Sequence, residues 1–216
     1  MYIYCYLQCD IQSFKEVCLM SGKLIEKKKQ KLTKLYNAAY DLLTANGVHN
    51  TIVDDIVKNA GVAKGTFYLY FKDKSDLVDK VIIRKTSSLL NGALEALKQD
   101  ALVDRNDFRQ SVIFIANYLI DFFVNDKKFL ELIHANLSIN LYHRLMDCEE
   151  MVFAREQFIS SYVRTSGSAE GAHRKLFIIT SLICSVCYNT IALEFPYRFE
   201  EVKGDLYDSI DKILSV

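Results

Sequence analysis

The 27 residues from Thr51 to Leu77, TIVDDIVKNAGVAKGTFYLYFKDKSDL, constrain the fold more than any other part of the chain. Apolar residues recur at helical spacing over Ile52–Val57, and Thr51 is expected to cap this helix, with Asp54 near the capping-box spacing. Gly61 follows as a residue that can take the left-handed conformation ending a helix. A second short helix is predicted at about 63–70. Two short helices joined by a tight glycine-containing turn are typical of a helix-turn-helix.

The second predicted helix has a polar edge that is unusual for a solvent-facing surface. This edge offers Lys64, Gly65, Thr66 and Tyr68, and Lys72 and Lys74 lie just beyond it. In a helix-turn-helix the second helix enters the major groove of DNA, where side chains and amides meet phosphates and base edges. Gly65 has no side chain, so the helix could approach the groove closely; the alternative is an ordinary mid-helix glycine.

The segment Val62–Phe71, followed by Lys72-Asp73-Lys74, resembles the recognition helix and the entry to the fourth helix of the TetR family of transcriptional regulators. The resemblance is close over Lys31–Leu77, and beyond it rests on the number and length of helices. It implies an N-terminal three-helix DNA-binding domain over residues 23–72. It also implies a C-terminal helical bundle over residues 73–216 that binds a ligand and dimerises.

The residues and the resemblance together predict a set of DNA contacts. Its members are Thr51, Lys64, Gly65, Thr66, Tyr68, Tyr70, Lys72 and Lys74. Thr51, Tyr68 and the two last lysines fit phosphate contacts, which position a protein on DNA without reading sequence. Tyr70 matches a position that often faces DNA in the family, but it could equally pack inward. Ala63 stands where the family commonly has a hydroxyl residue, which removes a helix cap and a potential phosphate contact.

Charge is unevenly distributed along a chain whose net charge is zero. Residues 20–85 contain 13 Lys and Arg against 7 Asp and Glu, whereas residues 86–216 contain 13 against 18. A basic N-terminal part on a neutral chain points to contact with a polyanion in that part. The lysine run at 27–29 is either a solvated face or a further phosphate contact.

Helix breakers are rare, with one proline and eight glycines in 216 residues, and half of the residues are hydrophobic. This composition favours long helices around a large core. Helical periodicity outside the helix-turn-helix predicts segments at about 23–46, 75–98, 107–124, 125–133, within 141–165, 169–194 and 200–214. The sequence has no strand-like alternation, so the predicted fold is all-α.

Residues 1–22 form an N-terminal extension that is rich in Tyr and Cys. They lack the cationic and long apolar regions of a signal peptide, and charged residues interrupt any membrane span. Because the sequence from Met20 onward looks like a natural start, we predict that translation begins there and that residues 1–19 are absent from the native protein. The alternative is a short extra element packed against the first helix.

The sequence gives no support to catalysis. The four histidines (His49, His134, His143 and His173) lie far apart, and neither a phosphate-binding glycine loop nor a nucleophile elbow is present. Cys184-x-x-Cys187 lies in an apolar helical run, so we expect buried, reduced thiols instead of a redox or metal site. We therefore expect no enzyme activity, catalytic residue, metal or cofactor. A helical enzyme and a protein-interaction module are the remote alternatives.

In the family that the chain resembles, a small-molecule pocket in the C-terminal domain shifts the spacing of two DNA-binding heads. The candidate pocket residues here are Phe114, Tyr118, Phe122, His134, Phe158, Tyr162, Phe177 and Tyr188. Each is either a ligand contact or an ordinary core residue, and together they suggest an apolar or aromatic ligand.

The expected assembly is a cytoplasmic homodimer that binds a near-palindromic double-stranded DNA operator and no membrane. The helices at Ala169–Glu194 and Phe199–Leu214 would pair with their copies as a four-helix bundle. Repression, with release by the ligand, is the default expectation. Activation or ligand-independent DNA binding is the alternative.

Overall fold

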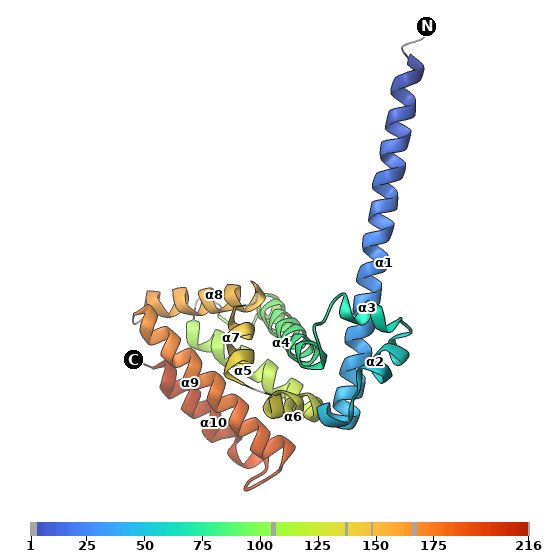
Figure 1. The fold of residues 1–216 in the computed structure, drawn as a ribbon. Helices are drawn as coiled ribbons and strands as arrows, with labels where there is room; N and C mark the ends of the chain where they lie inside the picture. Colours follow the sequence, from blue (N-terminus) through green and yellow to red (C-terminus); the bar gives the residue numbers. More distant parts are fainter. Residues whose placement is uncertain (1–3, 105–106, 137, 148, 166–167, 216) are drawn as a thin grey trace. The chain divides into compact units, whose positions relative to one another are not determined.

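The computed structural model describes residues 4–104, 107–136, 138–147, 149–165 and 168–215, and every regular element in these ranges is a helix (Figure 1). Side chains are described for residues 25–104, 107–136, 138, 141–147, 151–152, 154–164 and 168–215. The predicted all-α fold is confirmed. Contacts divide the chain into two compact units, Met1–Leu77 and Val78–Val216.

The first unit contains α1 (Tyr4–Asn50), α2 (Val53–Ala60), α3 (Lys64–Tyr68) and the first turn of α4 (Lys74–Gln99). Gly47 has φ 77° and ψ 163°, so the regular part of α1 breaks at the predicted glycine. At its other end α1 begins at Tyr4, well before the predicted start at Lys23. The side chains of the predicted extension, including Cys5, Cys9 and Cys18, lie outside the described residues, and the start at Met20 stays a prediction.

The core of the first unit is built from the apolar stripes that the sequence predicts. Leu35 and Leu43 of α1 and Ile56 of α2 are almost completely buried, and α1 packs against α2. Two aromatic residues, Phe67 and Phe71, close this core from the α3 side, with ring centroids 5.2 Å apart. Burying a side chain of this size stabilises the folded state by about 1.5–3 kcal/mol, so these contacts fix α3 against the rest of the unit.

The second unit consists of the remainder of α4 and the helices that follow. These are α5 (Phe108–Asn125), α6 (Lys127–Asn136), α7 (Ile139–Met146), α8 (Glu149–Thr165), α9 (Ala169–Cys187), the π-helical turn η1 (Tyr188–Ala192) and α10 (Phe199–Leu214). The helix predicted within residues 141–165 corresponds to α8, and α7 is a further helix that was not predicted separately. Ser138 caps α7, and its hydroxyl accepts a hydrogen bond from the Leu141 N–H at 3.1 Å. The helix ends at Met146, with Asp147 as its C-cap residue, before α8 begins.

The core of the second unit lies between α5, α9 and α10, which pack against one another. Ile120, Cys187 and Ile210 are fully buried there. Burial raises the pKa of the Cys187 thiol to about 12, and it also raises the pKa of Cys184. Of the two cysteines whose side chains the structure describes, Cys187 is buried, as predicted, whereas Cys184 is only partly buried. Their reduced state stays a prediction.

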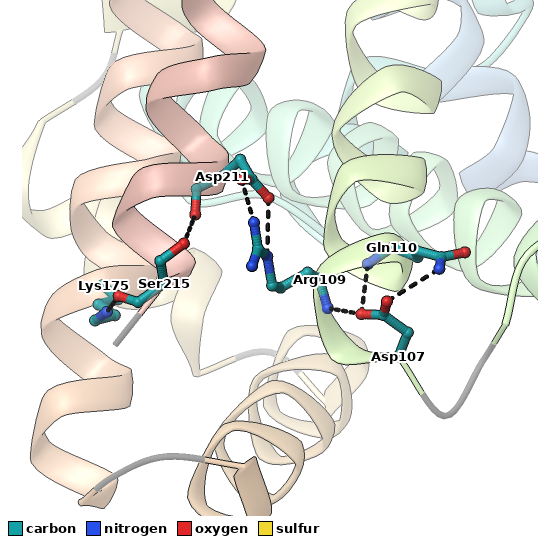
Figure 2. Close-up of polar contacts among 6 residues, drawn as sticks. All are labelled: Asp107, Arg109, Gln110, Lys175, Asp211 and Ser215. Carbon is teal, nitrogen blue, oxygen red and sulfur yellow. Dashed lines mark hydrogen bonds and ion pairs between the residues drawn. The ribbon is translucent and has the colours of Figure 1, made fainter.

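Polar contacts tie the ends of α5, α9 and α10 together (Figure 2). The Arg109 guanidinium pairs with the Asp211 carboxylate, with Nε donating to Oδ1 at 2.9 Å, and this pair lowers the pKa of Asp211. Lys175 Nζ of α9 donates to the Ser215 carbonyl at 3.0 Å, just after α10 ends. A cation that satisfies carbonyls at a helix C-terminus also interacts favourably with the helix dipole.

Asp107 caps α5, and its replacement by alanine should destabilise the second unit by about 1 kcal/mol. Its Oδ1 accepts hydrogen bonds from the backbone N–H groups of Arg109 and Gln110, and the bond from Gln110 is the largest cause of a lowered pKa. A lowered pKa means that this stability is present above the pKa of the unfolded chain and is lost as the pH falls through the lower folded value. Urea unfolding at a series of pH values measures the free energy of unfolding of the wild type and of Asp107→Ala. The difference between the two values should shrink in acid, and a difference that does not change with pH would contradict the cap assignment.

Candidate functional site

The segment from α2 to α3 has the geometry of a helix-turn-helix. Gly61 ends α2 in the left-handed conformation, with φ 63°. Its N–H donates to the Lys58 carbonyl, and the Val62 N–H donates to the Val57 carbonyl at 3.0 Å. These two bonds satisfy carbonyl groups that the helix end would otherwise leave unpaired. After this turn, α3 begins at Lys64, so the predicted glycine stop is confirmed.

The segment Lys64–Lys72, which contains α3, buries two phenylalanines and exposes five other residues, which together form its outward face. Phe67 is buried, and Phe71 meets Tyr36 of α1 edge-on, with ring centroids 5.5 Å apart. The exposed residues of the segment are Lys64, Gly65, Tyr68, Leu69 and Lys72. Tyr68 is 55% exposed and Leu69 is 79% exposed. A small folded unit gains nothing from exposing an aromatic and an aliphatic side chain beside two lysines, which marks this outward face of α3 as a candidate contact surface.

Lys64 forms an ion pair across the helix-turn-helix. Its Nζ lies 2.6 Å from Oδ1 of Asp54 in the first turn of α2, and both side chains are more than half exposed. The hydrogen bond to Asp54 raises the pKa of Lys64 above its ordinary value. The ammonium group is therefore held at the start of α3, where it can exchange its carboxylate partner for another anion.

Gly65 is exposed, and the fold itself does not require a glycine at this position. A Cβ atom built there would meet no atom within 4 Å. A glycine inside a helix costs about 0.5–1 kcal/mol relative to alanine. The open surface over this residue allows another molecule to approach the α3 backbone closely.

Two residues of the predicted DNA-contacting set have internal roles in the structure. Thr51 is 1% exposed, and its hydroxyl donates to the carbonyls of Gly47 and Leu42 at 2.8 and 3.2 Å. The expectation that Thr51 caps α2 is wrong, because the N-cap is Ile52, without a side-chain hydrogen bond. Lys74 donates to the carbonyls of Val48 and Thr51. Both side chains thus stabilise the turn that follows Gly47.

Thr66 and Tyr70 are half-buried, and the Tyr70 hydroxyl donates to the Lys28 carbonyl of α1 at 3.3 Å. The sequence reasoning did not single out Leu69 or the role of Asp54. The only sequence signal for Leu69 is its place between two aromatic residues of the second helix. For Asp54 the signal is a carboxylate in the first turn of the preceding helix.

The second unit contains a partly open cavity of about 390 Å³. Its wall comes from α4, α5, α8 and α9, with Met146 at the end of α7. Most of the lining is aliphatic, and Phe108 and Phe158 are its aromatic members. A volume of this size lies within the usual range of small-molecule sites, about 300–1,000 Å³.

Of the eight residues that the sequence suggested for a ligand pocket, the structure places Phe158 in the cavity wall. Tyr162 is buried beside Phe108, with ring centroids 5.9 Å apart. Phe114 lines a separate surface groove that includes Asp211. The other five lie as follows: Tyr118 faces Gly92, Phe122 packs on Phe129, His134 stacks on Tyr188, and Phe177 meets Tyr142. The cavity is therefore more aliphatic than predicted.

One side of α9 leaves apolar surface uncovered. Phe177 is 54% exposed and Ile178 is 47% exposed, and Ser181 and Ser185 continue the exposed side at helical spacing. The run Ala169–Ala192 is long and apolar enough to span a membrane by length and composition alone, and only 28% of its most apolar window is buried. Core helices of proteins without any membrane contact satisfy the same criteria. The low burial shows that much of this apolar helix surface is uncovered within a single chain.

Comparison with known proteins places these features in a family. Residues 35–81 match the family described as "Bacterial regulatory proteins, tetR family". The fatty acid metabolism regulator protein of Bacillus subtilis (strain 168) is 35% identical over 77 residues, which are 36% of this chain. Those residues span 40% of that relative, so the match covers well under two thirds of its length.

Two solved structures share the fold over most of the chain. FadR from Bacillus halodurans, a fatty acid degradation regulator, has a TM-score of 0.61 and 17% identity, covering 84% of this chain and 94% of its own. The transcriptional regulator FadR from Bacillus subtilis in complex with stearoyl-CoA has a TM-score of 0.60 and 19% identity. The match covers 85% of this chain and 97% of the FadR chain.

The family match falls on the part of the chain that contains the helix-turn-helix. It begins at Leu35, the first fully buried residue of the α1 stripe, and it ends at Val81 in α4. It includes Gly61 and the whole outward face of α3. The likeness in fold to the two FadR structures extends over both units. Residues 35–81 of this chain thus form a helix-turn-helix domain that matches the tetR family of bacterial regulatory proteins.

Proposed function

We propose that this protein is a DNA-binding transcriptional regulator, acting as a repressor that leaves its operator when a small molecule binds the second unit. The observation that carries the proposal is the outward face of α3, where Lys64, Tyr68 and Lys72 are exposed beside Gly65. In a helix-turn-helix, this is the face that enters the major groove. The match of residues 35–81 to a family of regulatory proteins supports the same function.

The residues of the DNA-contacting set have different proposed roles. Lys64 and Lys72 neutralise phosphates, and Tyr68 places its hydroxyl and ring at the backbone or at a base edge. Gly65 lets the α3 backbone approach the groove, which its open surroundings support. Thr66 and Tyr70 lie at the edge of the face. Thr51 and Lys74 act indirectly, because their hydrogen bonds hold the turn before α2.

The ligand is proposed to occupy the 390 Å³ cavity of the second unit. The aliphatic wall favours an apolar chain over a flat aromatic ligand. FadR from Bacillus subtilis, which shares the fold, was solved in complex with stearoyl-CoA, and this supports a ligand with an acyl chain. A ligand can release DNA only if it binds the DNA-free state more tightly than the DNA-bound state.

The active form is proposed to be a cytoplasmic homodimer held together through α9 and α10. The uncovered apolar side of α9, with Phe177 and Ile178, supports this assembly. Two-fold symmetry would present two recognition helices to a near-palindromic operator.

A gel-shift assay with the DNA upstream of the protein's own gene, repeated over a series of salt concentrations, tests the proposed function. Binding through phosphates releases counterions, so affinity should fall steeply as salt increases. An enzyme or a protein-interaction module of this fold would give no retarded, salt-sensitive complex. Absence of such a complex on upstream DNA would contradict the proposal.

Replacing Asp54 with asparagine should strengthen DNA binding by about two- to fivefold, as expected when one exposed ion pair is removed. The change frees the Lys64 ammonium from its carboxylate partner at 2.6 Å and removes a negative charge beside the proposed phosphate contacts. Asp55→Asn is the matched control, because it removes the same charge from the next residue of α2 and leaves the ion pair in place. Equal effects of the two variants would show that only net charge matters.

A further inference from the structure

The charge of the cavity wall in the second unit is one-sided. Among the lining residues that the structure describes, the charged ones are Lys98 and Arg155, and neither Asp nor Glu is among them. Ser111, Gln157, Ser161 and Thr180 provide the uncharged polar groups. A wall of aliphatic side chains with two cations is complementary to an apolar molecule that carries a negative charge.

Of the two cations, Arg155 has an unused hydrogen-bonding edge. Its Nη1 donates to the Met146 carbonyl at the end of α7 at 3.3 Å. Its Nη2 lies 3.7 Å from Oε1 of Glu156, which is beyond hydrogen-bond distance. Its Nε is buried and has no partner among the described residues. An unsatisfied buried donor is costly and rare in folded proteins, so it calls for an acceptor that the chain by itself does not provide.

Lys98 differs from Arg155 because its ion pair is at hydrogen-bond distance, whereas the ion pair of Arg155 with Glu156 is longer, at 3.7 Å. The Lys98 Nζ lies 2.7 Å from Oε1 of Glu95 on the same helix, and the Lys98 side chain is more than half exposed. The Arg155 side chain is 25% exposed, and its Nε and Nη2 form the edge of the guanidinium that binds carboxylates and phosphates in a bidentate manner. Arg155 is therefore the group suited to recognise an anion at the cavity.

We propose that the ligand of this cavity is an anionic amphiphile, with an aliphatic body against the apolar wall and one carboxylate or phosphate group paired with Arg155. This proposal rests on the proposed function, in which the cavity is the ligand site, and it adds the charge of the ligand and the residue that reads it. A neutral amphiphile of the same length offers the Arg155 guanidinium only an uncharged acceptor and so a weaker hydrogen bond. A cationic amphiphile offers no acceptor and is repelled, so both are selected against.

Calorimetric titration of the full-length protein with a matched set of ten-carbon ligands tests the proposal. The set is decanoate, decyl phosphate, decanoyl-CoA, decanol and decyltrimethylammonium. Decanoate or decyl phosphate should bind at least about tenfold more tightly than decanol, as expected for a charge-assisted hydrogen bond. A preference for decanoyl-CoA over both would place the recognised anion in a larger head group, whereas a preference for the free acid would place it at the chain end.

Arg155→Met should abolish the preference for the anion and leave decanol binding within about twofold of the wild-type value. Arg164→Met is the matched control, because Arg164 lies on the same helix, is exposed and is absent from the cavity wall. Arg155 also satisfies the Met146 carbonyl, so Arg155→Lys, which keeps the charge but lacks the Nε–H donor, provides a second variant if the methionine variant is unstable. In Arg155→Lys the preference should fall without disappearing.

Three results would overturn the proposal: decanol binding as tightly as the anions, an unchanged preference in both Arg155 variants, or no binding of any ligand in the set. A parallel gel-shift with upstream DNA separates this failure from that of the proposed function. If DNA binding is intact while the anion preference is absent, only the ligand assignment fails. If the wild-type protein does not bind DNA, the proposed function fails.

Discussion

Replacing Lys64 and Tyr68 together with alanine should reduce the affinity for the operator by about a hundredfold or more while leaving the fold intact. Both side chains are exposed, so their removal does not open the core around Phe67. Each lost contact occurs in both protomers of a symmetric complex, which multiplies the effect. Removing Lys64 from both protomers should also remove about two phosphate contacts. The slope of the logarithm of the binding constant against the logarithm of salt concentration should therefore become shallower by about two.

The control for this variant is Lys128→Ala, which removes an exposed lysine from α6 in the second unit. It changes net charge by the same amount as Lys64→Ala at a position outside the helix-turn-helix. Thermal unfolding monitored by circular dichroism should give similar midpoints for all three proteins. Operator affinity of the double variant within a few fold of the wild-type value would refute the assignment of the outward face of α3.

Replacing Phe177 and Ile178 with aspartate should convert the proposed dimer into monomers and weaken operator binding by about 100- to 10,000-fold. The two side chains provide exposed apolar surface on α9, and four carboxylates facing one another across a two-fold axis would repel. Once the protomers separate, each half-site is bound independently, and the advantage of a linked second site is lost. Sedimentation equilibrium and gel-shift titration measure the two effects separately.

Leu102→Asp is the control for the dimer variant, because Leu102 is 94% exposed between α4 and α5 and so belongs to neither α9 nor α10. It should remain dimeric and bind DNA normally. A Phe177→Asp/Ile178→Asp protein that stays dimeric would show that the interface lies elsewhere on the second unit.

The helix-turn-helix could be predicted from the sequence because the residues that define it are contiguous. Gly61 permits one backbone conformation that few other residues adopt, and Phe67 and Phe71 lie at the spacing that buries both. The direction of the Thr51 side chain could not be predicted in this way. A hydroxyl before a helix can bond forward to that helix or back to the preceding one, and the turn at Gly47 brings the carbonyl groups of α1 within its reach.

The cavity could not be predicted because its wall comes from helices that are far apart in the sequence. Helical periodicity shows that a face is apolar, but it does not show whether that face meets a neighbouring helix, an empty space or solvent. Phe158 and Phe177 illustrate this, since both lie in apolar helices. Phe158 lines the cavity, whereas Phe177 is exposed on the side of α9 that we propose as the dimer contact.

The proposed DNA contact through the outward face of α3 is tested most directly by the affinity of the wild-type and Lys64→Ala/Tyr68→Ala proteins for labelled upstream DNA, measured by fluorescence anisotropy as a function of salt. With Lys64 and Lys72 of two protomers on phosphates, the logarithm of the wild-type binding constant should fall with the logarithm of salt concentration with a slope of about −4 or steeper. The double variant should bind far more weakly, with a slope shallower by about two. Wild-type binding that is insensitive to salt, or a variant that matches the wild type in both affinity and slope, would contradict the proposed contact.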